Sequence, residues 1–199
     1  MSKRQDVPGT ASRILDVAEG LVQTRGFNGF SYADVAAELQ VTNASLHYHY
    51  RGKAELGEAL ITRYTSRFGQ ALDAIDRAGD AAPVKLAAYS RIYADVLRQG
   101  RMCLCGMLAA DYDTLPDAMR SAVVLFFDAS ERWLVRVLEQ GRADGTLEFT
   151  GSVVEVARSI VSGLEGALLI ARPYGDVSRF EAAADRLLAG LATSPARHH

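Results

Sequence analysis

The stretch SYADVAAELQVTNASLHYHYRGK, residues 31–53, decides the fold. Apolar residues recur at helical spacing after Ser31, and Ser31 with Asp34 has the pattern of a capping box, so a helix is predicted to begin here. The periodicity then breaks for two residues. Thr42 can cap a second, short helix that buries Leu46. Two helices joined by so short a turn predict a helix-turn-helix, whose second helix suits the major groove of DNA.

The second helix carries an unusual outward surface. Small polar residues, imidazoles and a phenol ring are expected to face away from Leu46. Such groups suit a helix that reads base edges and contacts phosphates better than a merely solvated one. The residues expected on this surface are Asn43, Ala44, Ser45, His47, Tyr48 and His49.

The sequence around this motif resembles a known family. Residues 13–60 are similar to the amino-terminal domain of the TetR/AcrR family of bacterial transcriptional regulators. Several signals occur in one order and at one spacing, which is more specific than a lone short motif. They are the Gly26-Phe27 turn after a first helix, the Ser31 helix start, the run Leu46-His47-Tyr48-His49-Tyr50, and Lys53 with Leu56 opening a further helix.

The resemblance implies an all-α protein with two domains. A three-helix DNA-binding helix-turn-helix domain is expected over residues 1–52, with Phe27 and Phe30 filling its small core. A larger helical domain that binds an effector and dimerises is expected over residues 53–199.

Helix signals continue along the rest of the chain, and their spacing predicts about nine helices in all. No alternating β pattern interrupts them. Beyond the two helices already described, helices are expected from about Thr10 to Gly26, from Lys53 to Ala78, from after Pro83 to Gln99, over 102–112, from Thr114-x-x-Asp117 to near Gly145, and from capping boxes at Ser152-x-x-Glu155 and Ser178-x-x-Glu181, with a stop at Pro173 and Gly175 between the last two.

The resemblance also implies specific DNA contacts. Family members use the positions of Ser31, Tyr48 and Lys53 to contact the DNA, chiefly its backbone. The first turn of the second helix, Asn43–Ser45, is predicted to meet base edges. The complete set predicted to bind DNA is Ser31, Thr42, Asn43, Ala44, Ser45, His47, Tyr48, His49 and Lys53.

Other roles remain open for these residues, and the chain departs from the family at two of them. Ser31 can serve as a helix cap alone, Tyr48 can shield the domain core, and Lys53 can be a solvated surface lysine. Gln40 stands where the family usually has Gly, so a left-handed backbone there would be strained. His47 stands where the family usually has Tyr, so that residue's phosphate contact does not transfer unchanged.

The composition is that of an ordinary globular protein, with 199 residues, 49% hydrophobic and 23% charged. A formal net charge of −2 does not by itself indicate a nucleic-acid binder, but DNA contact requires only a local basic patch. The basic residues expected near the DNA-facing end are Lys3, Arg4, Arg13, Arg25, Arg51 and Lys53.

Several classes of protein are disfavoured. No apolar run reaches membrane-spanning length, and the start MSKRQDVPGT lacks the apolar segment of a signal peptide, so a cytoplasmic protein with no membrane partner is expected. The motifs of common hydrolases, P-loop proteins and zinc enzymes are missing from the sequence. Neither an enzymatic activity nor a cofactor or metal is therefore expected, and of the four histidines two lie on the helix predicted to bind DNA and two, His198 and His199, at the tail.

A set of apolar and aromatic residues follows in the larger domain. By resemblance, this region encloses a small-molecule effector. By residue type alone, each of these side chains belongs more often to an ordinary core than to a ligand site. The predicted effector residues are Tyr89, Tyr93, Met102, Cys103, Leu108, Phe126, Phe127 and Trp133.

The helix containing VARSIVSGLEGALLIARPY, residues 156–174, combines small and apolar residues. Glycines inside a helix cost stability, so a close approach of another helix is expected to compensate for them. The family pairs its last two helices across a two-fold axis, and ordinary packing within one chain is the alternative. Glu165 is either an interface charge or an effector group. The predicted dimer residues are Gly163, Leu164, Gly166, Leu168, Leu187 and Leu191.

Cys103 and Cys105 allow three interpretations. A disulfide between them is disfavoured because residues two apart on a helix face different directions. Both can be inert core residues. Alternatively, Cys103 is activated near a helix start beside Arg101, and its modification disturbs the DNA-binding domain. The surrounding RMCLCGMLAADYDTLP resembles a TetR subgroup that includes regulators responsive to electrophiles and small unsaturated compounds.

These observations favour a homodimeric, ligand-responsive regulator, with repression favoured over activation. Two recognition helices would enter successive major grooves of a near-palindromic operator. A thiol-based sensor of the same fold is the main alternative, and a helical protein that binds another protein is a further one.

Overall fold

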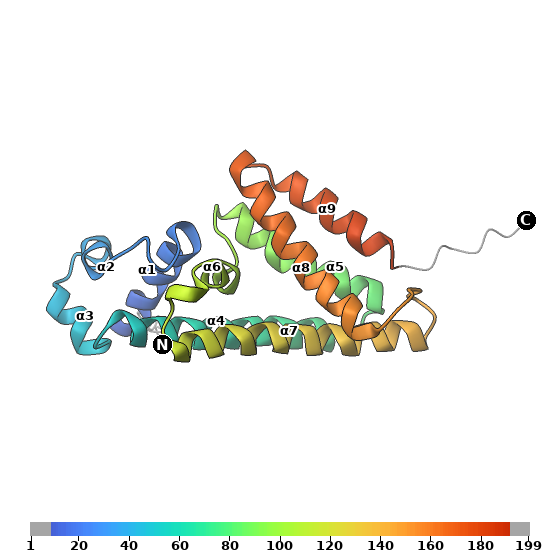
Figure 1. The fold of residues 1–199 in the computed structure, drawn as a ribbon, viewed down its shortest axis with the longest axis horizontal. Coiled ribbons are helices and arrows are strands. Elements are labelled where there is room, and N and C mark those ends of the chain that lie inside the picture. Colours follow the sequence, from blue (N-terminus) through green and yellow to red (C-terminus); the bar gives the residue numbers. More distant parts are fainter. Residues whose placement is uncertain (1–8, 192–199) are drawn as a thin grey trace, which may run out of the picture. The chain divides into compact units, whose positions relative to one another are not determined.

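The computed structural model describes residues 9–191, and within that range helices are joined by loops without a β-strand (Figure 1). The predicted all-α fold is confirmed. The helices are α1 (Thr10–Arg25), α2 (Tyr32–Leu39), α3 (Asn43–His49), α4 (Lys53–Arg77), α5 (Ala82–Arg98), α6 (Leu104–Ala110), α7 (Asp117–Ala143), α8 (Val153–Ala171) and α9 (Val177–Ala189), with short 3₁₀ helices η1 (Tyr112–Thr114) and η2 (Arg172–Tyr174).

The chain forms two compact units. Unit 1 contains the residues up to Tyr64 together with Leu104–Val123, and unit 2 contains Thr65–Cys103 together with the residues from Val124 onward. Both α4 and α7 therefore contribute to each unit. Unit 1 reaches further along the chain than residue 52, because α6 and the start of α7 pack into it. The functional division after residue 52 stays a prediction.

Local hydrogen bonds explain the helix-turn-helix. The Ser31 hydroxyl accepts from the Asp34 amide at 3.4 Å, while the Asp34 carboxylate accepts from the Ser31 amide at 2.7 Å, which confirms the capping box. The Thr42 hydroxyl accepts from the Ser45 amide at 3.3 Å and caps α3. Between the two helices, Gln40 has φ 55° and ψ 44°, so the strained left-handed turn expected where the family has Gly is present.

Unit 1 closes around a small apolar core. Leu46 is fully buried and anchors α3, and Phe27 and Phe30 are each 5% exposed with their rings edge to face, as predicted. Gly26 has φ 80° and lies so near Asp111 that an added Cβ would stand 2.9 Å from a carboxylate oxygen. Glycine is required there for both reasons.

Unit 2 has its core where α5, α8 and α9 pack together with the later parts of α4 and α7. Figure 1 shows α8 and α9 side by side, and α9 also packs on α5. Aromatic rings fill the space against α4 and α7. The rings of Phe68 and Phe126 have centroids 5.0 Å apart, and those of Tyr89 and Trp133 stack at 5.5 Å.

The predicted bounds of α9 and α6 are wrong in detail. The α9 helix begins at Val177 and is capped by Asp176, whose carboxylate accepts from both the amide and the hydroxyl of Ser178, so Ser178 lies inside the helix. The α7 helix begins at Asp117 and ends at Ala143, close to the predicted bounds, while Thr114 lies before it in η1 and its hydroxyl donates to the Asp111 carbonyl at 2.7 Å. The α6 helix is shorter at both ends than 102–112. The predicted capping box at Ser178 fails because the Asp176 carboxylate accepts from the Ser178 hydroxyl.

The capping box at Ser152 and Glu155 is confirmed. No helix within residues 9–191 is long and apolar enough to cross a membrane. The expectations concerning Lys3, Arg4, His198 and His199 fall outside the described residues.

Candidate nucleic-acid interface

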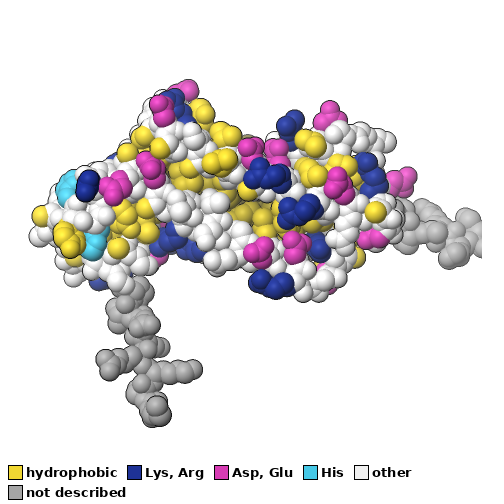
Figure 2. All heavy atoms as spheres, turned by 90° about the horizontal axis from the view of Figure 1, so that it is seen from below, with side chains coloured by type: hydrophobic (Ala, Val, Ile, Leu, Met, Phe, Trp, Pro, Cys, Tyr) yellow, Lys and Arg dark blue, Asp and Glu magenta, His cyan; other side chains and the backbone are white. Residues whose placement is uncertain are grey.

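The outward face of α3 is open to solvent. Tyr48 is 85% exposed although a tyrosine ring is large and partly apolar. Around it, His47 is exposed and His49 half-buried, and Figure 2 shows the histidine side chains at the surface of this end. The other residues predicted to bind DNA are exposed at Ser31, Thr42, Asn43 and Ala44 and half-buried at Ser45 and Lys53.

The His47 ring has a defined orientation. Its Nδ1 lies 3.2 Å from the Arg51 carbonyl oxygen, and its ring packs against Tyr32 with centroids 4.8 Å apart. Tyr32 in turn donates to the Tyr50 carbonyl at 3.0 Å, and burial together with the Glu55 carboxylate raises the pKa of its phenol to about 12. Because a carbonyl can only accept, Nδ1 carries the proton. The Nε2 atom therefore donates to a phosphate only when the ring is charged.

Lys53 is engaged inside unit 1. Its ammonium donates to the Phe30 carbonyl and lies 4.2 Å from the Phe30 ring centroid and 4.7 Å from that of Phe27. Burial lowers its pKa, whereas the carboxylates of Asp111 and Asp34 act in the opposite direction. Lys53 is therefore not a solvated surface lysine, and its ammonium is already engaged by the Phe30 carbonyl and the two rings. The predicted contact with a DNA phosphate would compete with these contacts.

The sequence-based reasoning missed Asp111. Its carboxylate accepts from the Phe27 amide at 2.7 Å, and the neighbouring Thr114 hydroxyl accepts from the Asn28 side chain at 2.7 Å. The end of α6 thereby holds the loop between α1 and α2. These pairs are 84 and 86 residues apart, so no local pattern indicates them.

Most of the predicted effector residues come together in unit 2. Tyr89, Tyr93, Phe126 and Trp133 are each at most 2% exposed, and Phe68, which was not predicted, lies between them. The Tyr89 and Tyr93 hydroxyls are 3.0 Å apart, and burial raises the pKa of both phenols. The remaining predicted residues are Met102 and Cys103, buried in unit 2, Phe127, half-buried in unit 2, and Leu108, buried in unit 1.

Glu165 brings a carboxyl group into this apolar surrounding. It accepts a hydrogen bond from the Cys103 thiol, while its Oε1 atom is inaccessible to solvent and lacks a hydrogen-bond partner in the described structure. Burial raises the pKa of Glu165 to about 7, and the bond from Cys103 lowers it in part. The residue is half-buried as a whole, and of its carboxylate oxygens Oε1 is inaccessible to solvent.

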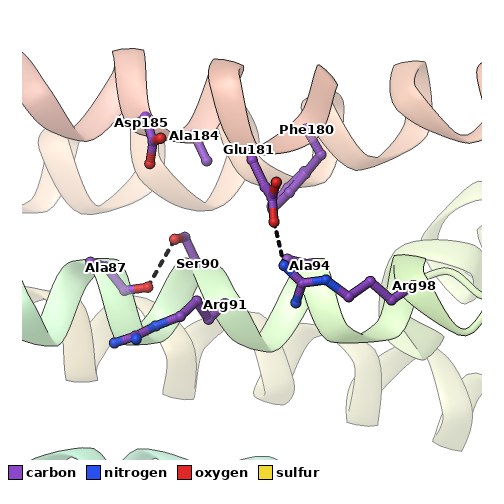
Figure 3. Close-up of a pocket in the computed structure, with 9 residues that line it drawn as sticks. All are labelled: Ala87, Ser90, Arg91, Ala94, Arg98, Phe180, Glu181, Ala184 and Asp185. Atoms are coloured by element: carbon purple, nitrogen blue, oxygen red, sulfur yellow. Dashed lines mark hydrogen bonds and ion pairs between the residues drawn. The ribbon is translucent and has the colours of Figure 1, made fainter. Parts of the chain in front are cut away.

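An open groove of about 330 Å³ lies between α5 and α9 (Figure 3). Alanines 87, 94 and 184 contribute to its lining, and Glu181 of α9 reaches across it to pair with Arg98 of α5. The predicted effector residues lie elsewhere. The lining of the groove carries charges of both signs, and the ion pair across it joins α5 to α9.

The predicted dimer residues divide into two groups. Leu164 and Leu168 are fully buried, and a Cβ on Gly163 would stand 2.8 Å from Leu187, so these side chains pack inside the chain. Their apolar character is explained by the core of unit 2. The face of α8 that is open to a partner instead carries Gly166, Leu169 and Ile170, the last two 57% and 65% exposed.

Among residues 9–191, no group of three His, Cys, Asp or Glu side chains is arranged to hold a metal ion. Cys103 and Cys105 are both buried and are not joined in a disulfide.

Comparison with known proteins gives two matches to families. Residues 14–60 match the bacterial regulatory proteins of the tetR family, and residues 83–187 match the tetracyclin repressor-like C-terminal domain.

Solved structures agree over nearly the whole chain. A TetR-family regulator from Agrobacterium tumefaciens has a TM-score of 0.89 at 29% identity, covering 92% of this chain and 97% of its own. One from Legionella pneumophila has a TM-score of 0.85 at 32% identity, covering 94% and 99%. The HTH-type transcriptional repressor NemR of Escherichia coli is 26% identical over 82% of this chain and 84% of its own. The crystal structure of the reduced form of NemR has a TM-score of 0.80 and covers 92% of this chain and 98% of its own.

Proposed function

Because this chain belongs to the tetR family of bacterial regulatory proteins, which are transcriptional regulators, we propose that it is a homodimeric repressor released from a near-palindromic operator by a small molecule. The observation that carries the DNA-binding part is the outward face of α3. Leu46 on the inner face of this helix is fully buried, whereas Tyr48 on its outer face is 85% exposed among small polar side chains.

Residues 1–52 would make the DNA contacts, with α3 in the major groove. The first turn of α3 would contact base edges through Asn43, Ala44 and Ser45. The DNA backbone would be contacted by Tyr48 and His47. Two such helices would enter successive major grooves, roughly 34–36 Å apart or somewhat more. Residues 53–199 would dimerise and bind the effector.

Support for a dimer comes from α8. Leu169 and Ile170 are large apolar residues left more than half exposed beside Gly166, where a second helix can approach closely. An isologous pairing of α8 and α9 with a second copy would cover them.

Support for effector binding comes from the aromatic cluster of unit 2. A ligand entering among Tyr89, Tyr93 and Trp133 would displace packed rings, and α4 contributes Phe68 to the same cluster. Because α4 also supplies Lys53 to unit 1, it offers a continuous route for the coupling. Such coupling requires a free-energy difference of roughly 1–3 kcal/mol between the two states.

The direct test is a mobility-shift and footprinting experiment on the DNA flanking the gene. Wild type should protect a site with two-fold symmetry, and Tyr48→Ala should bind it at least tenfold more weakly with an unchanged melting temperature. Leu125→Ala, which changes another exposed apolar side chain, is the matched control. Equal binding by Tyr48→Ala and wild type would remove α3 as the reading element.

A second candidate is a thiol-based sensor of the same fold. It is favoured by the hydrogen bond from Cys103 to Glu165 and by the likeness to NemR, whose structure is described as a reduced form. An electrophile or oxidant would then release operator DNA from wild type but not from Cys103→Ser. The same response from the double variant Cys103→Ser, Cys105→Ser would exclude this candidate.

A further inference from the structure

The outward face of α3 has a centre that helix geometry defines. Successive residues of an α-helix are about 100° apart around its axis. Leu46 is fully buried, so the direction opposite to it points away from the core of unit 1. Ala44 and Tyr48, about one turn apart, lie in that direction, and both are exposed. Asn43 and His47 form the adjacent row and are exposed as well.

Two polar side chains on the first turn of α3 are not committed to the fold. In the part of the chain that the structure describes, the Asn43 carboxamide and the Ser45 hydroxyl form no hydrogen bond. The His47 ring, by contrast, is held by its Nδ1 atom, 3.2 Å from the Arg51 carbonyl oxygen. The first turn therefore presents an uncommitted carboxamide beside the exposed methyl group of Ala44.

Basic residues are missing from this face. The sequence of α3, NASLHYH, contains neither lysine nor arginine. Guanine is most commonly read by these two residues, whose donors bind its O6 and N7 acceptors. Arg51 and Lys53 follow the helix, and the Lys53 ammonium is engaged by the Phe30 carbonyl. The centre of α3 therefore lacks the usual reader of guanine.

We propose that α3 selects A·T base pairs in the major groove, with Asn43 reading an adenine in each half-site and Ala44 contacting the methyl group of a neighbouring thymine. The proposal rests on the DNA-binding function proposed above and adds the base pairs that the operator must present. It assigns different tasks to the residues of α3. Asn43 and Ala44 select bases, whereas Tyr48 and His47 contact the backbone, which carries no sequence information directly.

The chemistry of the two side chains matches this base pair. The Asn43 carboxamide has an N–H donor and an oxygen acceptor in one plane, and adenine offers the complementary N7 acceptor and N6 donor. Guanine offers two acceptors at the same edge, so the carboxamide oxygen would lie opposite its O6 atom without a donor. The Ala44 methyl can cover the thymine methyl, an apolar group, without the loss of a hydrogen bond. The Ser45 hydroxyl donates or accepts and so tolerates any base.

The first experiment selects binding sites from random DNA with the full-length protein. Duplexes of randomised sequence are enriched by binding to wild type, and affinities are then measured by fluorescence anisotropy at one fixed salt concentration. Each enriched half-site should contain an A·T pair at which exchange of adenine for guanine weakens binding about tenfold. In Asn43→Ala the same exchange should have no effect, while preferences at the other positions remain. Gln99→Ala, which removes an exposed carboxamide from unit 2, is the matched control and should keep the adenine preference.

Base analogues test single atoms and leave the protein unchanged. Replacement of the adenine by 7-deazaadenine removes the N7 acceptor and should weaken binding by wild type about fivefold, but should not weaken binding by Asn43→Ala. Replacement of the thymine by deoxyuridine removes the methyl group and should weaken binding by wild type about fourfold, the value of one buried methyl-sized group, but should not weaken binding by Ala44→Gly. Circular dichroism checks that each variant keeps its helices.

The outcomes separate the base preference from the function on which it rests. If no position shows an adenine preference that Asn43→Ala loses, the proposal is overturned although the protein still binds specific DNA. Insensitivity of wild type to both base analogues has the same meaning. A guanine preference that disappears in His47→Gln assigns the reading to the imidazole and also overturns the proposal. Equal affinity of wild type for every duplex would instead remove the operator-binding function itself, and this proposal with it.

Discussion

At the scale of single residues, Glu165 opposes the stability of the fold that contains it. An isolated carboxylate loses its hydration when it is buried, and a single thiol is a weak hydrogen-bond donor in exchange. The result is a carboxyl group whose pKa lies near 7 in place of its ordinary 4.5. A group this costly is expected where a function requires it.

The pKa of Glu165 predicts how stability depends on pH. Because the folded value is above the unfolded one, the stabilising contribution of this carboxyl is fully present below pH 4.5 and is lost as pH rises to about 7. Glu165→Gln does not ionise and should be more stable than wild type at pH 8, by on the order of 3 kcal/mol. Urea unfolding at pH 4.5 and 8 measures this, and Glu58→Gln, at an exposed site, should behave as wild type. Parallel pH curves for Glu165→Gln and wild type would contradict it.

His47 predicts a second pH effect, on DNA binding. Its Nδ1 proton is directed at the Arg51 carbonyl, so a phosphate receives a hydrogen bond from Nε2 only in the charged ring. Operator affinity should therefore be higher with the charged imidazole at low pH than with the neutral one at high pH. His47→Gln should remove this dependence, measured by fluorescence anisotropy, while His49→Gln should retain it. A pH dependence that survives in His47→Gln would assign it to another group.

At the scale of elements, the fold depends on how helix ends are tied. The end of α6 holds the α1–α2 loop through the Asp111 carboxylate and the Phe27 amide, 2.7 Å apart. Hydrogen bonds to charged groups are typically worth about 1.5–3 kcal/mol. Asp111→Ala should lower the free energy of unfolding by about that amount, as measured in urea, and Asp111→Asn, which keeps an acceptor, by less. If Asp111→Ala unfolds at the wild-type urea concentration, the bond does not hold the loop.

Lys53 is the first residue of α4, and its contacts change how a test of DNA binding is interpreted. Its ammonium is bonded to the Phe30 carbonyl, so Lys53→Ala removes a packing contact as well as any phosphate contact. Weaker operator binding by that variant would not distinguish the two causes. The exposed Tyr48 has no such ambiguity.

Sequence patterns predicted the elements wherever the evidence is local. The caps at Ser31, Thr42 and Ser152 were predicted because a cap and its partner lie within three residues. The α9 cap was missed because Asp176 precedes the Ser178 pattern and takes its hydroxyl. Contacts between distant segments have no periodicity, which is why the pairing of Glu165 with Cys103 could not be predicted.

At the scale of the whole molecule, apolar spacing identified core-facing positions but not which neighbour covers them. Leu164 and Leu168 have the spacing of a dimer seam, yet both are buried against their own chain. Burial distinguishes packing within one chain from packing against a second copy only once the fold is known. The residues then left for a partner are those that a single chain leaves uncovered.

Ile170 gives the last prediction. It is 65% exposed on α8, and a charge there would have to be buried in a dimer but stays hydrated in a monomer. Ile170→Glu should therefore shift the protein to monomers in analytical ultracentrifugation with little change in helix content. Leu125→Glu, at a site on α7 that is 62% exposed, should leave the dimer intact. Because two linked recognition helices bind far more tightly than one, operator affinity should fall by about 100-fold or more in Ile170→Glu alone. A dimeric Ile170→Glu would show that the second copy binds a different face.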